Sequence, residues 1–94
     1  MAGMPTVELL ESRHTFPCRY TMKSIGAADG DFVQRVVHAV RDELKLSEDP
    51  EFTTAETRTG RHVSVTVEPV FETPQQVLAL YSRLSQLDGL VMQL

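Results

Sequence analysis

The sequence predicts an α+β fold: a ferredoxin-like βαββαβ sandwich with a four-stranded antiparallel sheet in strand order 4-1-3-2 and two helices on one face. Two observations lead to this prediction. Apolar residues recur at helical spacing in two separate stretches, and the stretches around them alternate apolar and polar residues as strands do. Right-handed crossovers and a central hairpin then give the strand order. Residues 1–17 are expected to be a mostly irregular N-terminal tail, and residues 18–94 a single domain.

The first strand and the first helix are predicted on either side of a short turn. In residues 18–25, apolar and polar side chains alternate, which is typical of a strand with one buried face. Small and turn-forming residues at 26–30 end this strand. Residues 31–46 form the first predicted helix, because its apolar side chains, from Phe32 to Leu44, recur at helical spacing opposite a polar face.

A hairpin is predicted in the middle of the chain. Residues 53–59 read as a threonine-rich strand, Gly60 as the turn, and residues 61–67 as a strand with valine at every second position. Pro69 cannot donate to a ladder of hydrogen bonds, so regular pairing is expected to end there.

The second helix has the clearest start signal in the sequence. Thr73 suits the N-cap, Pro74 the first helical position, and Gln76 the reciprocal position of a capping box. Leucines at helical spacing follow, and the Asp88-Gly89 pair ends the helix. The apolar residues 90–94 then read as the last strand.

Composition limits the function classes. The 94 residues suffice for one domain, and the formal net charge of −4 makes nucleic acid or an anionic membrane surface a poor partner. The single cysteine excludes an intrachain disulfide. We see no export signal and no run of about 20 apolar residues, so a cytoplasmic protein without a membrane segment is expected.

The predicted topology divides the strand residues between two faces. One set faces the helices as the core: Cys18, Tyr20, Met22, Val63, Val65 and Val67. The other set lines the open face, which is free of helices: Arg19, Thr21, Lys23, His62, Ser64, Thr66 and Glu68.

The two edge strands are expected to differ. The strand at 53–59 is polar and charged, as a protected edge is. The run 90–94 carries no charged side chain, so it invites pairing with another chain, and a homodimer is one expectation. The alternative is that Leu90 and Met92 pack inward and that the strand is too short to pair.

No recognisable catalytic or metal-binding motif appears in the sequence. His14, His38 and His62 lie apart without metal-ligand spacing, so we predict no metal and no cofactor. Cys18 is expected to be a buried hydrophobe rather than a nucleophile. For the acidic stretch 42–51, a solvated loop is favoured over a binding site for a cation or a basic partner. Heavy-metal carriers of this fold need a CxxC motif, acylphosphatases need an asparagine, and RNA-binding versions need exposed aromatic residues; these signatures are missing.

The turn at 26–30 allows two interpretations. It leads into a helix N-terminus, where backbone N–H groups favour anions. It is not a recognised phosphate-binding motif, however, and Asp29 and Asp31 would repel a phosphate. A purely structural turn and a ligand-binding loop therefore both remain open.

The chain resembles the YbeD family of small bacterial proteins. The resemblance runs from Leu9 onward, through Leu9-Leu10-Glu11, Phe16-Pro17, the strand ending at Gly26, the segment Gly60-x-His62-x-Ser64-Val65-Thr66-Val67, and Tyr81-x-x-Leu84 with Asp88. The family often has Tyr where His62 stands. The resemblance implies a ferredoxin-like fold similar to ACT regulatory domains, no established catalytic activity, and a link to lipoate metabolism. By analogy with ACT domains, it implies ligand binding at Gly26, Ala28, Asp29 and Gly30.

The expected function is thus a non-enzymatic regulatory or adaptor domain without catalytic residues. It would act through a protein partner or a small-molecule effector. Two alternatives belong to other classes: an RNA-binding ferredoxin-like module, and a small enzyme that uses His62, Ser64 and Glu68 on the open face.

Overall fold

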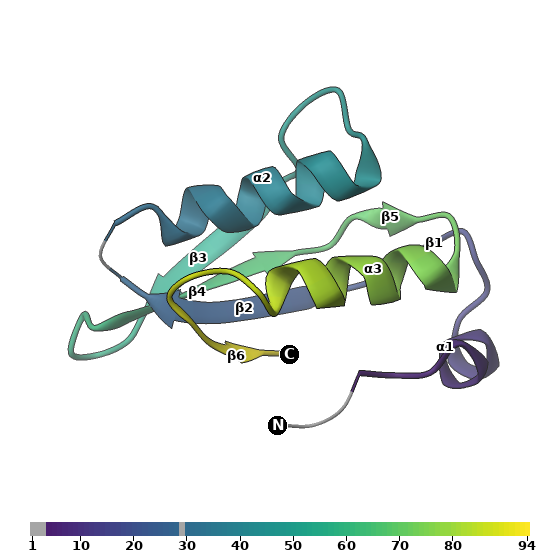
Figure 1. The fold of residues 1–94 in the computed structure, drawn as a ribbon, viewed down its shortest axis with the longest axis horizontal. Helices are drawn as coiled ribbons and strands as arrows, with labels where there is room; N and C mark the ends of the chain where they lie inside the picture. Colours follow the sequence, from purple (N-terminus) through teal and green to yellow (C-terminus); the bar gives the residue numbers. More distant parts are fainter. Residues whose placement is uncertain (1–3, 29) are drawn as a thin grey trace.

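The computed structural model describes residues 4–28 and 30–94 as three helices and six strands (Figure 1). In chain order these are α1 (Val7–Arg13), β1 (Cys18–Arg19), β2 (Met22–Ala27), α2 (Phe32–Leu44), β3 (Phe52–Glu56), β4 (His62–Val67), β5 (Val70–Phe71), α3 (Pro74–Leu84) and β6 (Leu90–Gln93). None of the helices in this part of the chain is long and apolar enough to cross a membrane.

The main sheet has four antiparallel strands in the order β3-β4-β2-β6. The α+β class with an antiparallel sheet is therefore confirmed, and α2 and α3 contribute to one core on one face of this sheet. The predicted order 4-1-3-2 counted four strands, whereas the part of the chain that the structure describes has six, so the order of the main sheet is written 3-4-2-6. The two additional strands, β1 and β5, form a separate two-stranded sheet. With those two short strands left out, the neighbours of the main sheet correspond to the predicted ones.

The predicted first strand is two strands with a break at residues 20 and 21. Its first part, β1, pairs with β5, and its second part, β2, pairs with β4 and β6. Tyr20 donates its backbone N–H to the carbonyl of Pro69 at 3.2 Å. The pairing of β4 ends at Val67, as the prediction from Pro69 required, and β5 begins after the proline as a separate strand of the other sheet. Cys18 and Tyr20 are only half-buried, so neither is a core residue as predicted.

The N-terminal segment is not the mostly irregular tail that the sequence suggested. Residues Val7–Arg13 form α1, and the Thr6 side chain caps it by accepting the backbone N–H of Leu9 at 3.1 Å. Leu10 is 3% exposed and belongs to the core cluster, and α1 packs against α3. Tertiary packing thus stabilises a helix of only two turns, which would be marginal in isolation.

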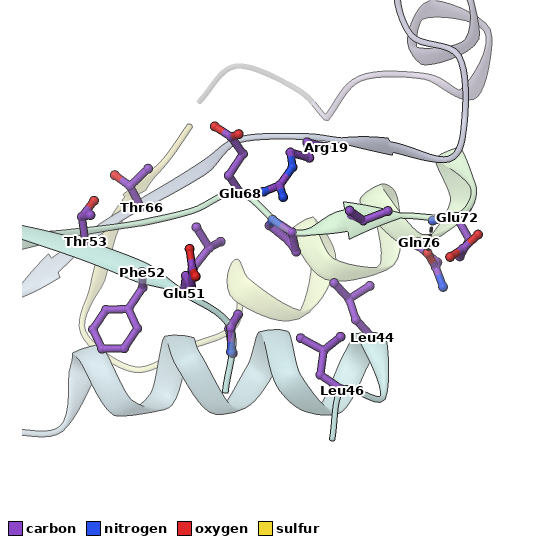
Figure 2. Close-up of a pocket in the computed structure, with 14 residues that line it drawn as sticks. Arg19, Leu44, Leu46, Glu51, Phe52, Thr53, Thr66, Glu68, Glu72 and Gln76 are labelled. Carbon is purple, nitrogen blue, oxygen red and sulfur yellow. Dashed lines mark hydrogen bonds between the residues drawn. The ribbon is translucent and has the colours of Figure 1, made fainter. Parts of the chain in front are cut away.

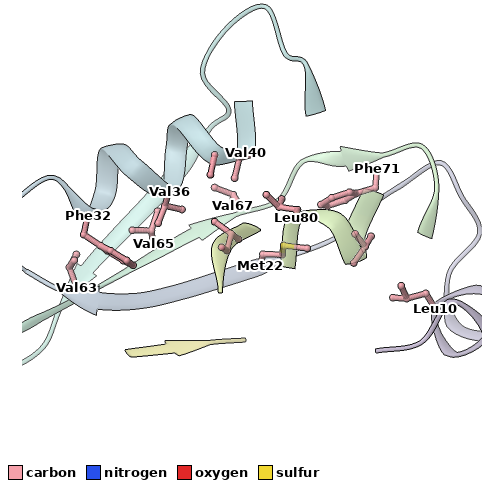
Figure 3. Packing of buried hydrophobic residues seen from close by; sticks show 13 residues of the cluster. Leu10, Met22, Phe32, Val36, Val40, Val63, Val65, Val67, Phe71 and Leu80 are labelled. Carbon is pink, nitrogen blue, oxygen red and sulfur yellow. The ribbon is translucent and has the colours of Figure 1, made fainter. Parts of the chain in front are cut away.

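One apolar layer joins the main sheet to the helices (Figure 3). The valines of β4, at positions 63, 65 and 67, are 6%, 0% and 2% exposed. Met22 of β2 lies beside them, as predicted. The helices contribute Phe32, Val36 and Val40 from α2, and Val77, Leu80 and Leu84 from α3.

The start of α3 follows the predicted cap with one difference. The backbone N–H of Gln76 donates to Thr73 Oγ1 at 3.3 Å, and Pro74 is the first helical residue. The side chain of Gln76 accepts from the backbone N–H of Glu72 at 2.7 Å, one residue before the N-cap. The cap therefore also fixes the exit of β5 into α3.

Gly26 makes the closest approach between the sheet and a helix. A Cβ atom at this position would lie 2.5 Å from ring atoms of Phe32, a distance that real Cβ contacts do not reach. Phe32 is 1% exposed, so its ring has little room to move. The missing side chain of Gly26 is thus what lets the first turn of α2 lie directly on β2.

We expect Gly26→Ala to lower the free energy of unfolding by about 1–3 kcal/mol, because the new methyl group overpacks the core. Denaturant titration measures this change. In the double variant with Phe32→Leu, Gly26→Ala should cost clearly less than it does alone, because the ring is gone. Equal costs in both backgrounds would contradict the steric explanation.

Candidate functional site

Three turns meet at one end of the main sheet. The backbone N–H of Ala28, between β2 and α2, donates to the carbonyl of Arg61 in the β3–β4 hairpin at 3.0 Å. Ala27 donates to the carbonyl of Gly89, between α3 and β6, also at 3.0 Å. We call this the three-turn end; it lies on the left in Figure 1.

The three-turn end contains the loop predicted to bind a ligand, but its residues have different roles. Gly26 is buried beneath Phe32 and has a packing role. Ala28 is half-buried and holds the hairpin through its backbone. Gly30 is exposed, has a φ of +73° and has open space around it. Asp29 lies outside the described residues. Among the described members of the predicted set, Gly30 is therefore the exposed one.

Arg35 of α2 adds a cation to this end. Its Nη2 donates to the backbone carbonyl of Asp88 at 3.1 Å. The backbone at Gly89, which has a φ of +86°, lies close to the Arg35 guanidinium. A Cβ atom at Gly89 would lie 3.5 Å from Nη2. The Nε of Arg35 is buried and has no hydrogen-bond partner among the described residues. Within the part of the chain that the structure describes, one guanidinium donor at the three-turn end thus has no partner.

A groove lies at the opposite end of the sheet (Figure 2). Its volume is about 920 Å³, and it runs between the end of α2, the start of β3, the end of β4 and β5. Apolar side chains include Leu44, Leu46, Val67, Pro69 and Val70. Three carboxylates and one guanidinium also line it: Glu51, Glu68, Glu72 and Arg19. Sequence reasoning missed this groove and assigned residues 42–51 to a solvated acidic loop.

The open face of the main sheet carries most of the polar residues that the sequence assigned to it, whereas Arg19 lies in β1 of the separate two-stranded sheet. Arg19, Thr21, Lys23 and Glu68 are exposed, and His62, Ser64 and Thr66 are half-buried. The hydroxyl of Thr21 donates to Glu68 at 3.0 Å, and the hydroxyl of Ser64 donates to the carbonyl of Ala55 at 3.3 Å. These hydrogen bonds tie neighbouring strands together.

The histidines lie in three different elements. His14 caps the end of α1, His38 is exposed on α2, and His62 begins β4. Among residues 4–28 and 30–94, no three His, Cys, Asp or Glu side chains converge as a metal site. Cys18 is a free, half-buried thiol in β1.

The β6 edge has the apolar, uncharged surface that the sequence predicted for residues 90–94, but not the side-chain directions of a regular strand. Met92 pairs with Ile25, but Leu90 pairs with Gly26, so β6 has one extra residue at this point. Such a bulge reverses which face the following side chains reach. Leu90 packs against the core, whereas Met92 lies on the open face, so the interpretation that both pack inward was wrong for Met92. Val91, Met92 and Leu94 are 61%, 50% and 54% exposed.

An aromatic cluster holds α1 and β1 against α3. The Tyr20 ring contacts the rings of His14, Phe71 and Tyr81 edge to face, with centroids 5.2, 6.0 and 6.3 Å away. The hydroxyl groups of Tyr20 and Tyr81 are 3.3 Å apart. Burial raises the pKa of Tyr81 well above its usual value, and the hydrogen bond and charge of Tyr20 raise it further. The fold therefore favours the neutral phenol of Tyr81.

We expect Tyr81→Phe to lower stability at pH 7 by about 0.5–1.5 kcal/mol, because one side-chain hydrogen bond is lost. The pKa of Tyr81 is higher in the folded state than in the unfolded chain, where it is about 10. The neutral phenol therefore stabilises the fold fully below about pH 10, and this stabilisation decreases as the pH rises further. The stability gap between the wild type and Tyr81→Phe should therefore narrow above about pH 10. Urea titrations from pH 7 to 11 measure the gap; a constant gap would contradict this account.

Comparisons with known proteins agree with the fold and place the chain in a family. UPF0250 protein PM1928 from Pasteurella multocida (strain Pm70) is 33% identical over 79 residues, which cover 84% of this chain and 88% of that protein. The solution structure of protein HP0495 from H. pylori matches with a TM-score of 0.60 and 16% identity. That match covers 100% of this chain and 98% of the other, and it supports the fold alone.

The family match covers most of the sequence and bears out the resemblance to YbeD-like proteins. It begins inside α1 and continues through the last strand. Residues 11–94 match the family described as "Protein of unknown function (DUF493)", and the chain belongs to this family.

Proposed function

We propose that the protein is a non-enzymatic adaptor domain whose β6 edge pairs with an extended segment of a partner protein. The observation that carries this proposal is the apolar, uncharged outer edge of the sheet at β6. Strand addition at such an edge combines main-chain hydrogen bonds, which give affinity, with side-chain contacts, which give specificity.

The backbone of β6 is arranged to accept a further strand. Lys23 and Leu94 exchange both backbone hydrogen bonds, at 3.1 and 2.8 Å. In an antiparallel ladder, residue pairs that exchange both hydrogen bonds alternate with pairs that exchange none, so the N–H and C=O of Gln93 point away from β2. The Gln93 side chain meanwhile accepts from Ser24 at 2.6 Å and donates to the carbonyl of Lys23 at 3.1 Å. β6 is thus fixed on its inner side and offers its outer side.

The two edges of the sheet differ in their protection. A charged or strongly polar edge discourages pairing with other chains, and β3 has this character with three threonine or glutamate side chains among its five residues. β6 has no charged side chain, and its exposed Val91 and Met92 add apolar area beside the free backbone. This contrast supports a partner at β6.

We expect Val91→Lys with Met92→Lys to abolish partner binding while the fold persists, because both side chains are exposed and lysine protects an edge. Leu9→Lys is the matched control, since Leu9 is 45% exposed on α1, away from β6. Quantitative pulldown from a bacterial lysate compares the three proteins, and light scattering shows whether the partner is a second copy. Equal capture by the β6 variant and the control would contradict the proposal.

A second candidate is an effector-binding regulatory domain that uses the three-turn end. The unused Nε of Arg35 beside the start of α2 favours it, because a guanidinium and helix N–H groups both suit a carboxylate. The accessible Gly30 belongs to the loop that the ACT resemblance indicated. Amino acids are therefore effectors to test, and the predicted link to lipoate metabolism adds lipoyl compounds.

A thermal-shift screen with amino acids, lipoate and lipoyl-lysine tests this second candidate. A bound effector should raise the melting temperature by an amount that grows with ligand concentration. Arg35→Gln should remove the shift, whereas Arg13→Gln, on the exposed end of α1, should keep it. A screen without any shift would leave only the protein-partner function. The RNA-binding and open-face enzyme alternatives stay predictions; salt-sensitive retention on a polyanion column tests the first.

A further inference from the structure

We propose that the groove at the end of α2 and β3 binds a basic, extended segment of a partner protein in which lysine or arginine alternates with aliphatic residues. This site lies at the opposite end and edge of the sheet from the β6 surface and the three-turn end. The inference goes beyond the adaptor function proposed above, because it gives the domain a second, chemically distinct docking surface.

The first argument is the apolar surface of the groove. Leu44 and Leu46 pack against the core on one side and line the groove on the other. Phe52 is 40% exposed and Val70 is 48% exposed, and both also line it. Figure 2 shows the Phe52 ring on the side of β3 where α2 lies. Aliphatic side chains of a ligand would remove this surface from water.

The second argument is charge. Glu51, Glu68 and Glu72 line the groove against the single cation Arg19, a formal charge of −2. Glu68 is held in place by the hydroxyl of Thr21 at 3.0 Å. Opposite charge attracts a basic ligand over a distance and sets its orientation on arrival. An acidic or neutral segment would lack this attraction.

The third argument is that β3 is free on its outer edge and uncovered on its helix side. Phe52, Thr54 and Glu56 pair with the three buried valines of β4, yet every residue of β3 is exposed. The helices therefore cover β4 but leave β3 bare. The backbone N–H of Thr57 donates to the carbonyl of His62 at 2.9 Å. Along an antiparallel strand, the backbone groups of successive residues point alternately toward the paired strand and away from it, so those of Glu56, Thr54 and Phe52 point outward. The polar side chains protect this edge against an apolar strand such as a second copy of β6. A basic segment can still pair there and enter the groove, because the acidic side chains attract it.

The fourth argument is that one wall of the groove is fixed before any ligand arrives. Arg41 binds Asp49 at 3.1 Å and the carbonyl of Ser47 at 2.9 Å. Its own carbonyl accepts the N–H of Leu46 at 2.9 Å. These bonds hold the loop from α2 to β3 across the end of the helix. A preformed wall lowers the ordering cost of binding.

The test uses a fluorescein-labelled heptapeptide of alternating lysine and valine, with lysine at both ends, and fluorescence anisotropy. We expect saturable binding that weakens as the salt concentration rises from 50 to 500 mM. Over this range the Debye length falls from about 14 Å to about 4 Å, so the attraction between exposed charges is screened. A glutamate–valine peptide should not bind. An oligolysine of equal length should bind about tenfold more weakly, because it lacks the aliphatic contacts.

Matched variants locate the site. Glu51→Gln with Glu72→Gln should weaken the lysine–valine peptide about fivefold to tenfold, since each exposed ion pair contributes little. Glu8→Gln with Glu11→Gln removes the same charge from α1 and should change the affinity less than about twofold. Phe52→Ser should weaken binding at high salt as well as at low salt. Circular dichroism shows that each variant is folded.

Three results would overturn the proposal. The first is no binding of the lysine–valine peptide at millimolar concentration. The second is equal affinity for oligolysine, or equal losses in the groove and α1 variants, which would indicate unspecific attraction to an acidic protein. The third is a set of NMR amide shifts confined to β6 or the three-turn end rather than to residues 44–53 and 66–72.

Discussion

The apolar layer between β4 and the two long helices is the constraint on which the rest of the structure depends. Its valines at 63, 65 and 67 are at most 6% exposed, and Phe32, Val36 and Leu80 close over them. Every second residue of β4 is buried, and this fixes the register of the sheet. A shift of β4 by one residue relative to its neighbours would expose the valines to solvent. Gly26 lets Phe32 enter this layer. The positions of both sheet edges follow from it.

The same layer explains why both proposed binding surfaces lie at the edges of the sheet. The helices cover the two central strands, so the helix-side residues of β3 stay exposed and a groove remains beside α2. At the opposite edge, the bulge between Ile25 and Gly26 turns Met92 to the open face and joins it to exposed Val91. One edge is thus acidic with an apolar groove, and the other is apolar and uncharged. This difference is what the proposed adaptor would need in order to contact two different segments.

The sequence allowed most of the core and the starts of α2 and α3 to be predicted, because they depend on local patterns. Alternation marked the β4 valines, and Thr73-Pro74 marked the start of α3. Features that depend on distant contacts were not predictable. Leu10 makes α1 stable only by reaching α3, and β1 finds its partner β5 beyond a proline. The bulge that exposes Met92 has no local signal, and the groove forms only where Arg19 meets the stretches 44–53 and 66–76. Arg35 reaches Asp88 across 53 positions of sequence.

Native-state hydrogen exchange of the isolated, dilute protein, followed amide by amide, tests the central claim most directly. If one apolar layer holds the sheet together and leaves both edges free, the backbone amide hydrogen of Val65 in β4 should exchange only through global unfolding. The outward amides of Gln93 in β6 and Thr54 in β3 should exchange far faster, at rates set by local opening. Equal protection of Gln93, Thr54 and Val65 would show that the edges are already covered and would contradict the account.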